Sequence, residues 1–367
     1  MAFVHESKDW PDLKWDDARL AKPLADVRYR QGLLLGQMKS LGFELRAEAN
    51  LKALTTEVVK SSSIEGERLS ADDVRSSIAR RLGMDVGGTS HASRDVEGVV
   101  EMMLNASQKY AEPLTQERLF DWHAALFPTG RSGMRRIAVG KWRTDEDGPM
   151  QVVSGPMGNE RVHFEAPGAQ RVEHEMSVFL GWFNNPENID PVLKAGVAHF
   201  WFVTIHPFDD GNGRIARAIA DMALAKAENT SERFYSASAQ IETERKQYYH
   251  ELESSQRGTA NITLWLEWFL GCLGRAIQKA DDDLASILRK AKTWDELNKG
   301  QVNARQRKVI NLLLGDFEGK LSTSKYARIA KCSEDTALRD IRDLVQRGIL
   351  VQNEGGGRSV SYRVCDF

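Results

Sequence analysis

The sequence predicts a mainly α-helical protein built from more than one domain. Apolar residues recur at three- and four-residue spacing through most of the 367-residue chain, which is typical of amphipathic helices. One stretch, 140–168, differs, because several Gly and Pro residues and alternating apolar residues predict a β-hairpin there. The pattern of residues changes again from residue 301 onward, which indicates a small independent unit. At about 100–200 residues per domain, the length allows two or three domains.

The composition is that of an ordinary globular protein. Hydrophobic residues make up 41% and charged residues 28%, which argues against a disordered or collagen-like chain. The formal net charge of −2 excludes a basic nucleic-acid coat, so any charge specialisation is local. Cys272, Cys332 and Cys365 lie far apart, which excludes a disulfide framework and a four-cysteine zinc site.

The same sequence predicts a cytoplasmic protein without a membrane segment. The N-terminal residues have no cationic stretch leading into an apolar one, as a secretory signal would. The most apolar windows, 196–208 and 262–273, are shorter than the ~20 residues that a membrane helix needs.

Local signals mark the helices expected before residue 230. Gly66 follows the second helix in the position of a helix-ending glycine. Asp190 as N-cap and Pro191 at the first helical position open a helix that is apolar on nearly every side, and such a helix belongs in the middle of a bundle. The expected helices cover residues 16–41, 48–64, 72–82, 94–110, 116–126, 170–184, 192–205 and 215–226. The strands of the hairpin are expected at 151–154 and 161–164, around a Gly-Pro-Met-Gly-Asn turn.

The C-terminal unit resembles a winged helix. After a charged helical connector, helices are expected at 306–314, 324–330 and 333–347, and strands at 348–351 and 359–364 around a glycine-rich turn. Thr336, Arg339 and Arg342 are expected to be exposed on the last helix. The unit has a modest excess of Lys and Arg, which permits contact with duplex DNA and equally fits a protein–protein or dimer module.

The candidate catalytic and binding residues gather in the segment 206–217, between the apolar helix expected at 192–205 and the helix expected at 215–226. Gly211 and Gly213 allow positive φ angles, so successive backbone N–H groups can point into one concavity. The segment leads into a helix N-terminus, whose free N–H groups and dipole favour an anion. Arg214 and Arg217 share a face of the first turn, where cations oppose the dipole unless a polyanion lies between them.

Three further residues complete this segment. Asp210 offers a hard oxygen ligand that suits Mg²⁺ beside a polyanion, His206 can take a proton at neutral pH, and Phe208 is expected to face inward. Together the parts fit phosphoryl or nucleotidyl transfer. Two alternatives stay open: a capped helix–turn–helix with solvated charges, and metal binding by His199 and His206, for which no third ligand is offered.

The segment resembles the signature of Fic-domain proteins, H-x-F-x-[DE]-G-N-G-R-x-x-R, and matches every fixed position. The resemblance covers roughly residues 114–273. It implies transfer of AMP from ATP, with Mg²⁺, to a Ser, Thr or Tyr hydroxyl of a target protein. The implied roles are His206 as the base, Asp210 as the Mg²⁺ ligand, Gly211, Asn212, Gly213 and Arg214 as the anion cradle, and Arg217 as the clamp on the γ-phosphate.

The resemblance extends to the surroundings of this segment. The 140–168 hairpin resembles the family's flap, which would pair with an extended target segment, although a connector hairpin remains an alternative. Tyr249 and Gln256 resemble the residues that line the adenine, with Gln256 where some members have Asn. Core packing is an equal interpretation for Tyr248 and Tyr249.

Residues 61–66 fit [S/T]-x-x-x-E-[G/N], which resembles the inhibitory-helix motif of Fic proteins with an N-terminal brake. Glu65 is expected in a last helical turn, where a carboxylate is disfavoured by ~0.3–1 kcal/mol unless a cation compensates it. The expected partner is Arg217, with Ser61 supporting Glu65 from one turn earlier. An ordinary surface glutamate is the alternative.

We therefore expect an autoinhibited protein adenylyltransferase with four regions. They are an N-terminal helical region, 1–110, with the inhibitory helix at about 48–65, a Fic core, 111–275, a helical connector, 276–300, and a winged-helix domain, 301–367. Removal of AMP, or another nucleotidyl or phosphoester transfer, is an alternative activity. A nucleotide-sensing regulator that binds DNA through 301–367 is an alternative of another class. Auto-modification and a homodimer are further possibilities.

Overall fold

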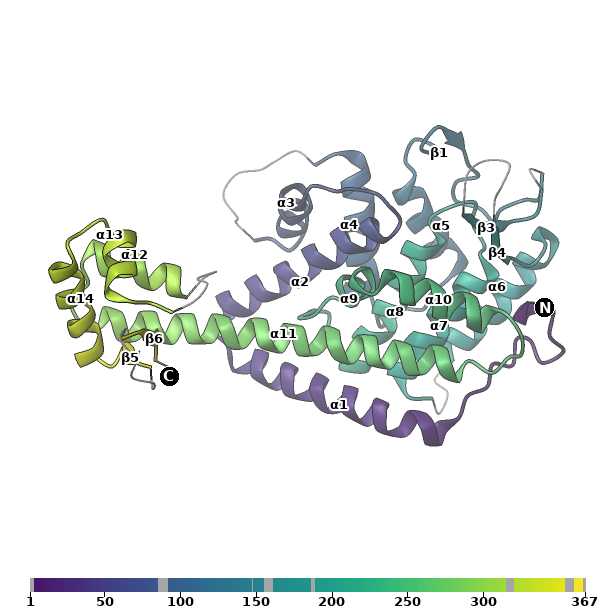
Figure 1. Ribbon diagram of the computed structural model, residues 1–367. Helices are drawn as coiled ribbons and strands as arrows, with labels where there is room; N and C mark the ends of the chain where they lie inside the picture. Colours follow the sequence, from purple (N-terminus) through teal and green to yellow (C-terminus); the bar gives the residue numbers. More distant parts are fainter. Residues whose placement is uncertain are drawn as a thin grey trace. The chain divides into compact units, whose positions relative to one another are not determined.

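The computed structural model confirms a mainly helical protein with small strand hairpins. It describes residues 3–84, 92–146, 148–154, 161–185, 189–314, 320–353 and 360–365. The chain divides into two compact units, 1–280 and 281–367 (Figure 1). Within the described ranges, none of the helices combines the length and the hydropathy of a membrane span.

The first unit begins with a short 3-10 turn and four helices. Helix α2 packs against α3, α4, α8 and α9, so it lies directly on the elements that carry the segment 206–217 (Figure 1). It ends as predicted, because Gly66 has φ +87°. The elements are η1 (Val4–Glu6), α1 (Asp17–Ser40), α2 (Phe43–Ile64), α3 (Ala71–Arg81) and α4 (Arg94–Gln108).

The centre of this unit is helix α7, which is buried along almost its whole length and packs against α6 and α8. The predicted start is confirmed, since the Asp190 carboxylate accepts a hydrogen bond from Val192 N and Pro191 is the first helical residue. The helices of this part are α5 (Gln116–Leu126), α6 (Ala169–Asn184), α7 (Pro191–Ile205), α8 (Asn212–Glu228), α9 (Ala237–Thr243), α10 (Arg245–Gln256) and α11 (Thr263–Asn298).

Two antiparallel hairpins flank these helices. The smaller one pairs β1 (Arg131–Ser132) with β2 (Arg135–Arg136) and was not predicted. The larger one pairs β3 (Gln151–Ser154) with β4 (Arg161–Glu165), where the sequence predicts strands. Its register shifts after Val152, so β4 carries a β-bulge. The predicted Gly-Pro-Met-Gly-Asn turn lies outside the described residues.

The second unit contains three helices and a two-stranded sheet around its own core. Apolar residues of all three helices, of the segment before β5 and of β5 itself are buried together. The elements are α12 (Ala304–Leu313), α13 (Thr323–Ala330), α14 (Glu334–Gln346), β5 (Leu350–Gln352) and β6 (Tyr362–Val364). The glycine-rich turn at 354–357 lies outside the described residues. The helical connector expected at 276–300 corresponds to the last part of α11, which extends to Asn298.

Candidate functional site

The loop between α7 and α8 has an unusual backbone at both ends. His206 ends α7 in the left-handed region with φ 51°, and Gly211 precedes α8 with φ +80°. A Cβ on Gly211 would lie 2.9 Å from the Phe127 ring, so both the backbone and the space require glycine there. The positive φ that the sequence allows at Gly213 is not used, because Gly213 lies within α8. A Cβ on Gly213 would lie 2.2 Å from a carboxylate oxygen of Glu65, so a larger residue there would displace the Glu65 side chain.

Buried polar contacts hold this loop in shape. The Asn212 side chain accepts from Phe208 N at 3.0 Å and donates to Phe208 O at 2.8 Å. Arg143 donates to the carbonyl oxygens of His206 through Nε (2.8 Å) and of Pro207 through its backbone N (2.9 Å). Phe208 is fully buried, as predicted, and its ring stacks on His123 at 4.2 Å. The Asn212 side chain therefore holds the loop, and the backbone N–H of Asn212 can serve a ligand.

His206 is held as a neutral imidazole. Its Nδ1 lies 3.2 Å from the carbonyl oxygen of Val203 and donates to it, which leaves Nε2 with a free lone pair. Burial lowers the pKa of His206 to about 4, with a further contribution from Arg143. The side chain is therefore unprotonated at neutral pH and can accept a proton.

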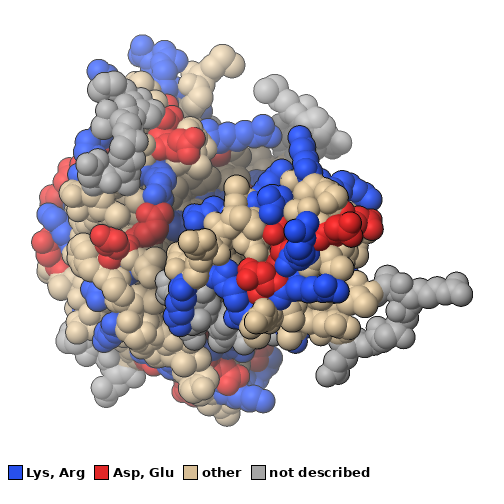
Figure 2. Space-filling model, turned by 90° about the vertical axis from the view of Figure 1, so that its left-hand side faces the viewer, with Lys and Arg blue, Asp and Glu red and all other residues tan. Residues whose placement is uncertain are grey.

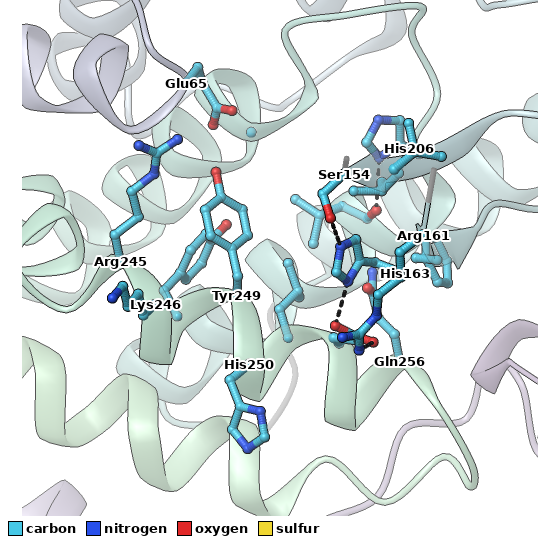
Figure 3. A pocket seen from close by; sticks show the side chains of 18 residues that line it. Glu65, Ser154, Arg161, His163, His206, Arg245, Lys246, Tyr249, His250 and Gln256 are labelled. Atoms are coloured by element: carbon cyan, nitrogen blue, oxygen red, sulfur yellow. Dashed lines mark hydrogen bonds and ion pairs between the residues drawn. The ribbon is translucent and has the colours of Figure 1, made fainter. Parts of the chain in front are cut away.

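His206 lines a cavity of about 680 Å³ (Figure 3). Tyr249 and Gln256 line the same cavity, as do Glu65, Gly213 and residues of β3 and β4. Tyr249 is 38% exposed and its hydroxyl lies 3.4 Å from Ile64 O, at the end of α2. Tyr248 is instead a core residue, since it is buried and its hydroxyl contacts His199 Nε2 at 2.9 Å.

Both arginines of the segment are buried, and each one contacts a glutamate that follows α2. Arg217 Nη2 lies 2.8 Å from Glu65 Oε1. Arg214 Nη1 lies 2.6 Å from Glu67 Oε2, although burial raises the pKa of Glu67. In the described part of the chain, Nη1 of Arg217 and Nε of Arg214 are buried without a hydrogen-bond partner. These donors can serve an additional anion.

Ser61 does not contact Glu65 in the way that the sequence predicts. Its hydroxyl and its carbonyl oxygen both accept from Arg217, from Nε and Nη2 respectively, at 2.8 Å each. The end of α2 therefore holds this guanidinium through both Ser61 and Glu65.

Asp210 lies at the mouth of the loop. One carboxylate oxygen accepts from the Ser132 hydroxyl and the other accepts from Gly211 N at 2.5 Å. No group of three or more His, Cys, Asp or Glu suited to a metal occurs among the described residues. A single carboxylate fits Mg²⁺ when phosphate oxygens and water supply the other ligands. His199 belongs to the core contact with Tyr248, which does not fit the alternative of a His199–His206 metal site.

Sequence reasoning missed Glu67, Arg143 and Ser132. Of these three residues, only Glu67 could have been found from the sequence, because it is a second carboxylate two residues after Glu65 in the turn that follows the helix. Arg143 and Ser132 lie far from the motif in the sequence and reach it only through the tertiary fold.

The fold and the site define a helical protein whose loop before α8 offers N–H donors suited to an anion, and comparison with known proteins places part of the chain in a family. The Fic/DOC family model matches residues 113–224, and a model described as a domain of unknown function, DUF4172, matches residues 3–84. The chain therefore contains a Fic/DOC domain.

Several relatives are named protein adenylyltransferase Fic. The protein from Drosophila grimshawi is 26% identical over 214 residues, which are 57% of this chain and 40% of that protein. The protein from Nematostella vectensis is 38% identical over 63 residues, 17% of this chain and 15% of that protein. The chain thus spans two fifths or less of the length of these two relatives.

A crystal structure of a Fic family protein from Desulfovibrio desulfuricans G20 shares the fold. It is 20% identical, with a TM-score of 0.52, and the match covers 94% of this chain and 95% of that one.

Proposed function

We propose that the protein transfers AMP from ATP to a hydroxyl group of a protein. The observation that carries the proposal is a neutral imidazole with a free Nε2 in the same cavity as the N-terminus of α8. Two buried arginines with spare N–H donors adjoin that helix end. An imidazole that can take a proton, beside a cradle for a polyphosphate, supports nucleotidyl transfer. The names of the relatives favour the same chemistry.

In this proposal each residue of the segment has one task. His206 Nε2 takes the proton of the attacking hydroxyl. The backbone N–H groups of Gly211, Asn212 and Gly213 and the guanidinium of Arg214 bind the phosphates, because first-turn N–H groups lack helical partners. Asp210 would hold Mg²⁺, which neutralises charge on the phosphates when bound. Further residues complete the site: Arg217 clamps the γ-phosphate, and Tyr249 and Gln256 line the adenine.

The hairpin β3–β4 is the proposed docking edge for the target. Val152, Val153 and Val162 on it are each more than a third exposed, which is unusual for an apolar strand unless a partner covers it. An extended target segment could add as a strand and present its Ser, Thr or Tyr hydroxyl to the cavity.

Glu65 is the proposed brake. Its carboxylate occupies the guanidinium of Arg217 that the γ-phosphate needs, and Ser61 accepts hydrogen bonds from Nε and Nη2 of the same guanidinium. ATP bound in this state lacks its γ-phosphate clamp, so its α-phosphate is not aligned with the attacking hydroxyl.

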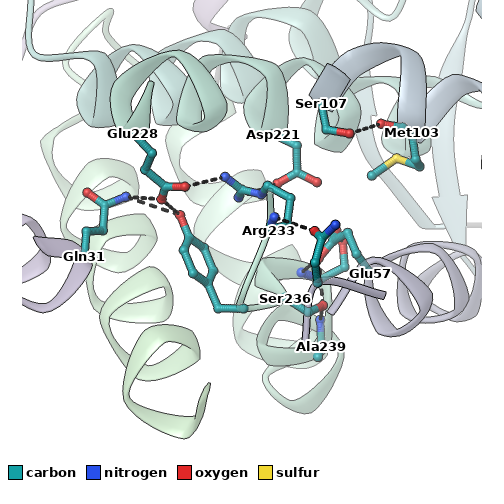
Figure 4. Close-up of polar contacts among 12 residues, drawn as sticks. Gln31, Glu57, Met103, Ser107, Asp221, Glu228, Arg233, Ser236 and Ala239 are labelled. Atoms are coloured by element: carbon teal, nitrogen blue, oxygen red, sulfur yellow. Dashed lines mark hydrogen bonds and ion pairs between the residues drawn. The ribbon is translucent and has the colours of Figure 1, made fainter. Parts of the chain in front are cut away.

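A buried polar cluster fixes the brake helix in place (Figure 4). Glu57 of α2 accepts from the Ser236 hydroxyl at 2.7 Å and from Ser238 N at 3.0 Å, at the start of α9. Asn50 of α2 accepts from Arg233 N at 2.8 Å, and Arg233 in turn contacts Asp221 of α8 at 3.1 Å. Because these groups are buried, α2 cannot leave the core without exposing or stranding them, which keeps Glu65 on Arg217.

The proposal is tested by incubating the purified chain with Mg²⁺, ATP labelled in the adenine, and a cell extract. The Glu65→Gly variant should attach label to the extract proteins faster than the wild type, and Glu65→Gly combined with His206→Ala should attach none to them. Equal labelling by the single and double variants would exclude His206 as the base. Absence of label on any protein with Glu65→Gly would refute the proposed activity.

Removal of AMP from a modified protein is a second candidate activity of the same site. The Glu65 carboxylate lines the cavity together with His206, so it could orient a water molecule that removes AMP from a modified protein. Proteins labelled by the Glu65→Gly variant are the substrates for this test. Release of free AMP by the wild type, but not by Glu65→Gln, would establish removal as the resting activity.

The surface of α14 gives limited support to the DNA-binding alternative. Arg339 and Arg342 are exposed, but Glu334 and Asp335 occupy the first turn, where DNA phosphates would otherwise be favoured. Figure 2 shows Lys and Arg mixed with Asp and Glu on this face, which is not a continuous basic surface. A duplex-DNA mobility shift that weakens with salt and is lost in Arg339→Ala would favour the regulator. No shift at low salt would exclude it.

A further inference from the structure

A second imidazole lies in the same cavity, on the hairpin rather than on the loop. His163 of β4 contacts Ser154 of β3 (Figure 3), and its other ring nitrogen contacts Glu253 of α10. Its Nε2 is 2.6 Å from Ser154 Oγ, and its Nδ1 is 2.7 Å from Glu253 Oε2. The three side chains therefore form a Ser–His–Glu relay on the cavity wall, in addition to the loop described above.

The hydrogen-bond directions in this relay follow from the chemistry of the end groups. The Glu253 carboxylate only accepts, so Nδ1 of His163 carries the proton. Although burial raises the pKa of Glu253, hydrogen bonds from His163 and Arg161 lower it overall and keep the carboxylate ionised. In a neutral imidazole Nε2 then accepts from the Ser154 hydroxyl, which is the arrangement of a serine next to a general base.

The backbone supports this alignment. Val152 pairs with Phe164 and Val153 pairs with Val162, so His163 is the extra residue of the β4 bulge. Bulges often redirect a side chain toward a site, and this one places the imidazole between the hairpin and α10. Arg257 fixes the bulge by donating Nη2 to the carbonyl oxygen of His163 at 3.0 Å.

We propose that Ser154 is an acceptor of AMP in cis. The inference rests on the proposed function, because it needs ATP bound in the cavity that His206 and Ser154 both line. Ser154 Oγ attacks the α-phosphorus, and a new bond forms between the two atoms. The bond from that phosphorus to the β-phosphate oxygen breaks, and pyrophosphate leaves. The hydroxyl proton passes to His163 Nε2, and Glu253 stabilises the imidazolium through Nδ1–H.

Attachment of AMP would change what the hairpin can do. The nucleotide would lie on the cavity side of β3, next to the valines that form the proposed docking edge. The modified chain should therefore accept an extended target segment less well, and cis modification should limit transfer to other proteins.

The experiment uses the full chain with Glu65→Gly, Mg²⁺ and ATP, followed by intact mass and peptide mapping. One added AMP should map to Ser154. The fraction of chains modified per unit time should not depend on protein concentration. Ser154→Ala should lose this adduct, and Ser154→Thr should keep it, because the hydroxyl is retained. His163→Gln should lower the rate by about 10²-fold or more, as expected for loss of a general base. Ser40→Ala, at the exposed end of α1, is the matched control and should label normally.

The outcomes separate the two proposals. Label that maps to another residue, or an equal adduct in Ser154→Ala, overturns the cis acceptor while leaving AMP transfer in place. If the fraction of chains modified per unit time rises in proportion to protein concentration, the cis step is overturned, since this indicates transfer between molecules. Absence of label on this chain and on every protein of an added extract refutes the proposed function itself.

Discussion

Neutralising the two glutamates that follow α2 should have unequal effects, and the structure gives the reason. Glu65 contacts Arg217, whose side chain is only 2% exposed, and is itself 32% exposed. A hydrogen bond to a charged, largely buried partner contributes about 1.5–3 kcal/mol. Since each 1.4 kcal/mol is about tenfold, Glu65→Gln should raise the rate of AMP transfer by about 10- to 100-fold.

Glu67 should matter less, because more of it is in contact with water. Its side chain is 44% exposed, although Arg214 is 3% exposed. A pair with one half-exposed member contributes about 1 kcal/mol or less, so Glu67→Gln should raise the rate about fivefold at most. Both substitutions keep the shape of the side chain and remove only its charge.

The assay is the initial rate of AMP incorporation, measured at several ATP concentrations for wild type, Glu65→Gln and Glu67→Gln. Glu48→Gln is the matched control, since Glu48 lies on α2 and contacts Arg75 rather than the loop. A change below threefold for Glu65→Gln, or a larger gain for Glu67→Gln than for Glu65→Gln, would refute the assignment of the brake to the Glu65–Arg217 contact.

Three further predictions concern the supports of the site. Gly211→Ala should weaken ATP binding in calorimetry by about tenfold or more, because φ +80° costs a side chain roughly 1–2 kcal/mol and its Cβ meets Phe127. Unchanged affinity would contradict this. Glu57→Gln should destabilise the fold by about 1–3 kcal/mol in urea unfolding and also raise AMP transfer, because α2 loosens; destabilisation without activation would separate Glu57 from the brake. Burial lowers the pKa of His123 to about 4 and of His199 to about 3, so the unfolded chain takes up protons first as pH falls below 6.5. Stability present at pH 7 should therefore fall by about 2 kcal/mol per histidine at pH 5, and equal stability at both pH values would show that neither is held neutral.

The sequence predicts the helices whose ends have local signals. Asp190 and Pro191 define the start of α7, and Gly66 defines the end of α2. The start of α2 at Phe43 was placed five residues too late, because its N-cap Gly42 offers no side-chain hydrogen bond and Phe43 is 84% exposed, outside the apolar repeat. Helix α8 begins at Asn212, three residues before the predicted start at 215. Its N-cap, Gly211, also makes no side-chain hydrogen bond and has a left-handed conformation.

The contacts of the site are likewise of two kinds: some are predictable from short motifs, and others depend on long-range packing. The contact between Glu65 and Arg217 was expected from two short motifs, and the structure brings both residues together. The contacts of Arg143 with the loop and of His163 with Glu253 join segments separated by 63 and 90 residues. Spacing along the chain carries no information about such pairs, because the tertiary packing decides them.

The most direct measurement of AMP transfer compares two forms of ATP that differ only in the labelled phosphate. The Glu65→Gly variant, with Mg²⁺ and a cell extract, is incubated with ATP labelled at the α-phosphate or at the γ-phosphate, and label bound to the extract proteins is counted. Label from the α-position alone, lost when His206→Ala is added, is the predicted result. Label from the γ-position, or from neither, would contradict the transfer of AMP by this loop.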